Sequence, residues 1–152
     1  YYLWLLACLF ICWLIWAASV WLNDSPTSSR ILVVDTDCDL RAGPCETVFP
    51  EGGSVHFSIE PRSIPLLKPL QLKVVVEGKL VDQVSVDING VDMNMGTNLV
   101  KLVAQEGGSF TGNASLSVCI RDVMEWEARI MLRTGDDITV VPYRFITTKT
   151  YP

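Results

Sequence analysis

The stretch "EWEARIML", Glu125 to Leu132, decides the fold class because its residues alternate between two kinds of side chain. One face would carry Trp126, Ala128, Ile130 and Leu132, and the other Glu125, Glu127, Arg129 and Met131. Successive side chains of a strand point to opposite faces, so this period of two predicts a half-buried antiparallel strand. Trp126 is the only tryptophan outside the first 22 residues, and we predict that it anchors a hydrophobic core.

Similar short runs, rich in β-branched and aromatic residues, recur along most of the remaining chain. We predict strands near residues 30–35, 54–60, 70–78, 82–88, 98–105, 109–118, 125–133 and 138–148. Turn residues separate these runs, as in "PEGG" and "TGDD", and Pro142 inside the last run predicts a bulge or an edge strand. About eight short strands predict an all-β fold, an antiparallel sandwich of the immunoglobulin or cupredoxin type.

The first 22 residues, "YYLWLLACLFICWLIWAASVWL", contain no charged side chain. At a rise of about 1.5 Å per residue, about 20 apolar residues cross a hydrocarbon core about 30 Å thick. Tyrosine and tryptophan near the two ends are typical of positions at the headgroup boundary. We therefore predict an N-terminal transmembrane helix over residues 1–22, a polar linker over 23–30 and one exported sandwich domain over 31–152.

The charged residues all follow the apolar segment, and the chain has a net charge of −5. This balance argues against a nucleic-acid partner, which would require a basic surface. The sequence contains no G-x-S-x-G, H-E-x-x-H or phosphate-binding glycine motif. His56 is the only histidine, and no nucleophile is indicated beside it. We therefore predict that the protein is not an enzyme.

Three cysteines follow the apolar segment, and this odd number predicts one disulfide and one free thiol in an oxidising compartment. A bond between Cys38 and Cys45 would close the loop "CDLRAGPC", and a bond from either of them to Cys119 is equally compatible with the sequence. No C-x-x-C pair occurs, so structural zinc is not expected. Cys8 and Cys12 lie one helical turn apart, and we expect them to contact a neighbouring membrane helix.

The stretch "VDMNMG", Val91 to Gly96, follows a run whose even-numbered apolar residues share the inward face. Continuing that register would turn the polar residues of the motif inward and both methionines outward. We therefore predict that the register changes at Gly90, and that the motif is an exposed loop or strand end.

Met93 and Met95 are candidate copper ligands because thioethers are soft donors that favour Cu(I). Two sulfurs would need a further ligand, and the candidates are His56, Cys45, Cys119 and Met124. The alternative is that the two methionines are adaptable packing against a neighbouring segment. His56 alternates with apolar residues in "SVHFSIE", a position more typical of a solvated side chain than of a ligand.

Four stretches resemble bacterial membrane-anchored proteins that accompany respiratory oxidases: "CDLRAGPC", "FSIEPRSIPLLKPL", "VDMNMG" and "VCIRDVMEWEAR". With the predicted helix, the short linker and the Met-x-Met-Gly loop, the chain resembles the FixH/YtkA-like accessory proteins. The resemblance implies copper delivery and the assembly of haem–copper oxidases, and metal-binding roles would carry over to Met93 and Met95. The chain departs from copper chaperones with richer Met/His loops, which provide more ligands.

These observations lead us to expect a single-pass accessory or assembly protein of a respiratory haem–copper oxidase that handles Cu(I) transiently. It would lie in a bacterial inner membrane with its domain in the periplasm, and its partners would be integral membrane subunits of the complex. The alternative is a non-metal immunoglobulin-like binding or adhesion domain that is tethered to the membrane.

Overall fold

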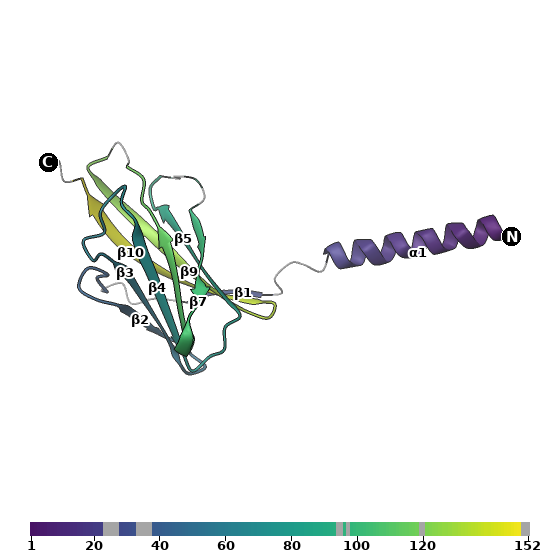
Figure 1. The fold of residues 1–152 in the computed structure, drawn as a ribbon, viewed down its shortest axis with the longest axis horizontal. Coiled ribbons are helices and arrows are strands. Elements are labelled where there is room, and N and C mark those ends of the chain that lie inside the picture. Colours follow the sequence, from purple (N-terminus) through teal and green to yellow (C-terminus); the bar gives the residue numbers. More distant parts are fainter. Residues whose placement is uncertain (23–27, 33–37, 94–95, 97, 119–120, 150–152) are drawn as a thin grey trace.

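The computed structural model describes residues 1–22, 28–32, 38–93, 96, 98–118 and 121–149, without the side chains of residues 3, 8 and 20–22. One helix, α1 (Tyr2–Leu22), precedes a domain built of strands (Figure 1). The strands are β1 (Ser28–Ile31), β2 (Cys45–Val48), β3 (Ser54–Glu60), β4 (Leu70–Glu77), β5 (Gln83–Gly90), β6 (Leu99–Lys101), β7 (Val103–Ala104), β8 (Ser109–Ala114), β9 (Val123–Thr134) and β10 (Asp137–Thr148), with a short 3-10 turn, η1 (Glu106–Gly108), before β8.

The strands form two five-stranded sheets, which confirms the predicted sandwich of antiparallel-rich sheets. Sheet A has the strand order β1-β10-β9-β5-β6, and sheet B has the order β2-β3-β4-β8-β7. The β1–β10 pair is parallel, whereas the neighbours of β9 and of β3 pair with them in antiparallel fashion. The long β9–β10 hairpin is the centre of sheet A, and its two strands have 12 residues each.

The strands β2, β6 and β7 differ from the sequence-based prediction. β2 was not predicted, because its four residues, Cys45–Val48, are too short a run to show a period. The predicted strand over 98–105 is divided, since β6 pairs with β5 in sheet A and β7 pairs with β8 in sheet B. The chain changes sheet at Leu102, which is buried and donates its N–H to the carbonyl oxygen of Val84 at 2.9 Å.

The core lies between the inward faces of the two sheets. Trp126 is 1% exposed, which confirms its predicted role as a core residue. The hydroxyl of Tyr143 on β10 lies 2.8 Å from Thr47 Oγ1 on β2, so one buried hydrogen bond joins the two sheets. The Tyr143 ring stacks on Phe57 with 5.7 Å between ring centroids. Burial raises the pKa of the Tyr143 hydroxyl above its ordinary value.

Pro142 lies in the middle of β10 without a bulge, because Val141, Pro142 and Tyr143 stay in continuous register with β9. The carbonyl of Val140 accepts the N–H of Leu32, so this side of β10 faces β1. Residues two apart in a strand direct their backbone groups to the same side, so the nitrogen of Pro142 also faces β1 rather than β9. The missing N–H of Pro142 therefore removes no hydrogen bond between β9 and β10. The edge-strand alternative is wrong as well, since β10 lies between β1 and β9 in sheet A.

β1 begins at Ser28, so the domain starts inside the segment that we assigned to a polar linker over 23–30. Its polar residues reveal no strand period, and parallel pairing with β10 is what makes the segment extended. Residues 23–27 lie outside the described part of the chain. In Figure 1, α1 and the C-terminal end of β10 lie on opposite sides of the sandwich.

The predicted helix over residues 1–22 is helical from Tyr2 to Leu22 and carries no charge. Nearly all of its described side chains are exposed. Across the residues that the structure describes, no helix is long and apolar enough to cross a membrane. Cys12 is an exposed free cysteine, and the side chain of Cys8 is not described, so their contact with another helix stays a prediction.

Candidate functional site

The candidate site lies at the end of the sandwich that is far from α1. β10 begins at Asp137, which pairs with Ser28 near the helix, and ends at Thr148. Its 12 residues span about 40 Å at about 3.3 Å per residue, which separates the two ends of the domain. We call the far end the distal end, and its described segments are residues 38–44, 61–69, 91–93, 115–118, 121–122 and 149.

The described part of the "VDMNMG" motif is a bend at the distal end of β5, as predicted. The predicted change of register at Gly90 is wrong, because Gly90 still pairs with Trp126. Val91 continues the ladder by donating its N–H to the carbonyl of Glu125 at 3.0 Å. The chain turns away from β9 only after this hydrogen bond, so β5 ends without a change of register.

Glycine is required at position 90 because a side chain would clash with neighbouring atoms, and not because the backbone has a positive φ angle. A Cβ atom at this position would lie 2.5 Å from Cε of Met124 and 2.6 Å from the carbonyl oxygen of Met93. The absent side chain therefore lets the methionine segment fold back over its own strand, with Met124 of β9 against it. Met93 is half-buried and packs against the core, in agreement with the packing interpretation of this residue.

The candidate metal ligands are only partly brought together. His56 lies on the outer face of sheet B, where its Nε2 is 3.2 Å from Ser54 Oγ and 3.8 Å from the carboxylate of Glu46. Met93 lies at the end of a strand of sheet A, so the core separates it from His56. Cys45 is fully buried and disulfide-bonded. Among the candidate partners that the structure describes, Met124 is the one whose side chain reaches Gly90, where the Met93 carbonyl also lies.

Met95 and Cys119 lie outside the described residues. Within the described ranges, no group of three or more histidine, cysteine or acidic side chains could hold a metal ion. The candidate thioethers that the structure describes at this end are Met93 and Met124.

The methionine segment is linked to the loop that precedes β9. Arg121 Nη1 donates to a carboxylate oxygen of Asp92 at 3.1 Å, and both side chains are at least half exposed. A recess of about 490 Å³ lies beside the segment, and its lining includes Asn89, Met93 and Arg129. The segment thus borders a solvent-filled recess on one side and contacts the core on the other.

A disulfide joins Cys38 to Cys45, with 5.8 Å between their Cα atoms, and confirms one of the predicted pairings. It closes the loop before β2, whose Asp39 carboxylate accepts the N–H of Arg41 at 2.9 Å. Arg62 Nη1 donates to the carbonyl of Ala42 at 3.2 Å, which ties this loop to the β3–β4 loop. The disulfide therefore holds one wall of the distal end in place.

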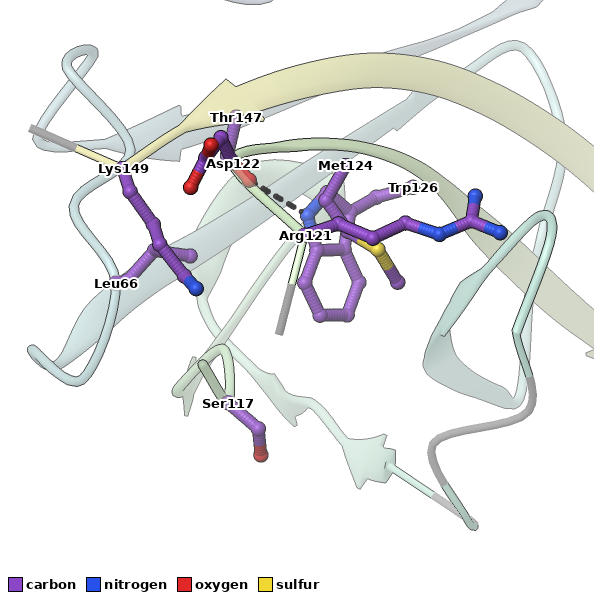
Figure 2. A pocket seen from close by; sticks show the side chains of 8 residues that line it. All are labelled: Leu66, Ser117, Arg121, Asp122, Met124, Trp126, Thr147 and Lys149. Carbon is purple, nitrogen blue, oxygen red and sulfur yellow. Dashed lines mark hydrogen bonds between the residues drawn. The ribbon is translucent and has the colours of Figure 1, made fainter. Parts of the chain in front are cut away.

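Figure 2 shows a shallow hollow at the distal end, between Leu66, Ser117 and the last residues of β10. Its floor is formed by Trp126, Met124 and Thr147, and its rim carries Arg121, Asp122 and Lys149. The hollow leaves no room for a water-sized molecule between its lining side chains. It acts as the edge of the core rather than as a binding site.

A larger groove adjoins this hollow and shares Leu66 and Lys149 with it. Its volume is about 740 Å³, and its cationic members are Arg41, Lys68 and Lys149. Sequence reasoning missed this feature, because the three cations belong to separate segments and form no local motif. Only the convergence of these segments at the distal end makes them neighbours.

Comparisons with known proteins returned no match: no family model, no curated protein and no solved structure matches the chain.

Proposed function

We propose that the protein is a membrane-anchored accessory or assembly protein of a respiratory haem–copper oxidase, and that its distal methionine segment handles Cu(I) transiently. The observation that carries the proposal is the position of Met124 against Gly90 and the Met93 segment. It supplies the further soft ligand that the Met93–Met95 pair lacks in the sequence. Other support comes from the resemblance of the chain to FixH/YtkA-like proteins.

Anchoring by α1 is part of the proposal. The helix has 21 residues without charge and would be about 31 Å long, close to the thickness of a hydrocarbon core. The Cys38–Cys45 disulfide is in keeping with an exported domain in an oxidising compartment such as the periplasm. In a sandwich of the immunoglobulin or cupredoxin type, the distal end would then face away from the bilayer, toward the exported part of a partner.

A thioether site suits transient handling of the ion. Thioether sulfurs are uncharged and carry no proton, so copper binding displaces none and should not depend on pH between about 5 and 8. The half-burial of Met93 means that binding must compete with its packing against the core, which limits affinity.

Anaerobic titration of the full chain with Cu(I), in a neutral detergent and against a chromogenic chelator, tests the copper function. Leucine matches methionine in volume, so Met93→Leu with Met95→Leu, and separately Met124→Leu, should preserve the fold. We expect each variant to lose at least about tenfold in Cu(I) affinity. Met131→Leu is the matched control, because Met131 lies opposite Ser85 and Val140, within sheet A. A chain that binds no Cu(I), or a control that loses as much, would overturn the copper function.

Purification from detergent-solubilised membranes tests the oxidase association. An oxidase that elutes with the tagged chain supports the proposal, and its absence from the eluate overturns it. Extraction of the same membranes at alkaline pH tests α1 separately. We expect the chain to stay in the membrane pellet, whereas release into the supernatant would show that the helix does not anchor it.

A further inference from the structure

The groove of about 740 Å³ at the distal end is built from four separate segments. The β3–β4 loop forms one wall, from Ser63 to Leu66 and Lys68. Arg41 enters from the disulfide-closed loop, Val118 from the segment after β8, and Thr148 with Lys149 from the end of β10. None of these segments is close to another in the sequence, so the groove is a product of the fold.

The charge of the groove is opposite to that of the whole chain, which is net −5. Among the described residues, Arg41, Lys68 and Lys149 make no ion pair. The acidic residues nearby are largely engaged: Asp39 accepts the backbone N–H of Arg41, and Glu60 pairs with Arg62 at 3.4 Å. Asp122 lines the adjoining hollow together with Lys149. Among the described residues, Asp122 is the one carboxylate in the lining of the adjoining hollow, and the exposed Asp39 carboxylate lies two residues from Arg41.

The wall of the groove is held in an unusual backbone conformation. Ile64 and Leu67 have φ values of +46° and +56°, a region that a β-branched residue such as isoleucine rarely adopts. Ile64 is 2% exposed and donates its N–H to the carbonyl of Pro61, and Leu67 donates to the carbonyl of Leu116, both at 2.9 Å. Such strain persists where the surroundings over-determine it, and it occurs often at ligand clamps. The loop is therefore a preformed wall.

The lining favours an acidic protein segment over other anions. Pro65, Leu66 and Val118 give the groove an apolar component beside its three cations, which a phosphate ion would leave uncovered. A nucleic acid carries a phosphate charge at every nucleotide, and three cations beside an apolar strip form too small a basic surface for it. Lipid headgroups are disfavoured because the groove lies at the end of β10 remote from α1. A peptide that combines carboxylates with apolar side chains complements both parts of the lining.

We propose that this groove binds an acidic, partly apolar segment of a partner protein, whose carboxylates pair with Arg41, Lys68 and Lys149. The preformed loop lowers the entropy cost of binding because it does not have to become ordered. The groove does not include Met93 or Met124, so the proposal goes beyond copper handling and does not depend on it.

The test uses the full chain in a neutral detergent and a fluorescent peptide of alternating glutamate and leucine. We expect saturable binding that weakens as salt is added, and at least about tenfold weaker binding of the matched glutamine–leucine peptide. Lys68→Glu with Lys149→Glu turns two attractions into repulsions and should lower affinity at least about tenfold. The matched control is Lys73→Glu with Lys101→Glu, two exposed lysines on β4 and β6 outside the groove, and its affinity should stay within about twofold of the unmodified chain.

Other outcomes would overturn the proposal. If the peptide does not bind, or if the control pair weakens binding as much as the groove pair, the groove is not a specific site. Inorganic phosphate or anionic phosphatidylglycerol vesicles serve as competitors. Displacement of the peptide by either at a lower concentration than by unlabelled peptide would assign the groove to that anion instead. Each result is independent of whether the chain binds Cu(I) or associates with an oxidase.

Discussion

The indole Nε1–H of Trp126 donates a hydrogen bond to Thr147 Oγ1 at 2.8 Å, and both side chains are buried (Figure 2). The bond crosses between β9 and β10, where Trp126 pairs with Phe145 and Thr147 pairs with Met124. A buried indole N–H needs a partner, because water cannot reach it. The distal end of the core therefore depends on this one hydroxyl.

Replacing Thr147 with valine keeps the shape of the side chain but leaves the indole N–H unpaired. We expect a loss of about 1–3 kcal/mol in the free energy of unfolding, measured by urea denaturation. Thr147→Ser should retain most of this stability, because it keeps the hydroxyl. The neighbouring Thr148 is exposed, and Thr148→Val should change stability by less than about 0.5 kcal/mol. Equal losses for the two valine variants would contradict the role of the hydrogen bond.

Gly90→Ala tests the close approach beneath the methionine segment. The new Cβ would meet Met124 Cε at 2.5 Å and the Met93 carbonyl oxygen at 2.6 Å, and the backbone atom cannot move without displacing the segment. We expect a loss of about 1–3 kcal/mol and, if the copper function holds, weaker Cu(I) binding. Gly43→Ala is the control, since its Cβ would meet nothing within 4 Å. A stable Gly90→Ala variant would show that the segment is free to shift.

The Cys38–Cys45 disulfide should stabilise the domain by closing its loop in the unfolded chain. With a sequence separation of 7, we expect its removal by Cys38→Ala with Cys45→Ala to cost about 2–3 kcal/mol. Urea unfolding with and without reductant measures the same effect in the unmodified chain. Cys12→Ser, in α1, should leave the unfolding of the domain unchanged. Identical unfolding curves for oxidised and reduced protein would contradict the prediction.

Glu127 should make the stability of the domain depend on pH. A hydrogen bond from Arg129, helped by one from Arg144, holds the pKa of Glu127 below its ordinary value of 4.5, although partial burial opposes this. A carboxylate whose pKa is lowered on folding contributes stability above its unfolded pKa, and this is lost as the pH falls through the folded pKa.

The variant Glu127→Gln measures that contribution. Both arginines are more than half exposed, so we expect the contribution of Glu127 to be at most about 1 kcal/mol at pH 6–7 and to be lost as the pH falls through the lowered pKa of Glu127. Glu77→Gln, at an exposed position on β4 without an ion pair among the described residues, is the control and should show no such pH trend. A Glu127 contribution that grows toward acid pH would contradict the sign.

Much of the fold could be predicted because its strands carry their own periodic signal. β9 and β10 are long and alternate between buried and exposed residues, so Trp126 could be assigned to the core from its neighbours alone. A strand was predicted over 30–35, whereas β1 begins at Ser28, and β2 was not predicted; such four-residue strands become extended only when a partner strand supplies hydrogen bonds. The end of β5 was misjudged for the same reason: Glu125 keeps Val91 in the ladder past Gly90.

The sequence by itself determined the fold class, the uncharged N-terminal helix and the choice of Cys38 and Cys45 as possible disulfide partners, because each depends on spacing or composition along the chain. The tertiary structure decided which thiols pair, which methionine lies against Gly90, and which cations share a groove. These depend on how the two sheets pack and which loops meet at the distal end. Such contacts join residues far apart in the chain, and no local pattern records them.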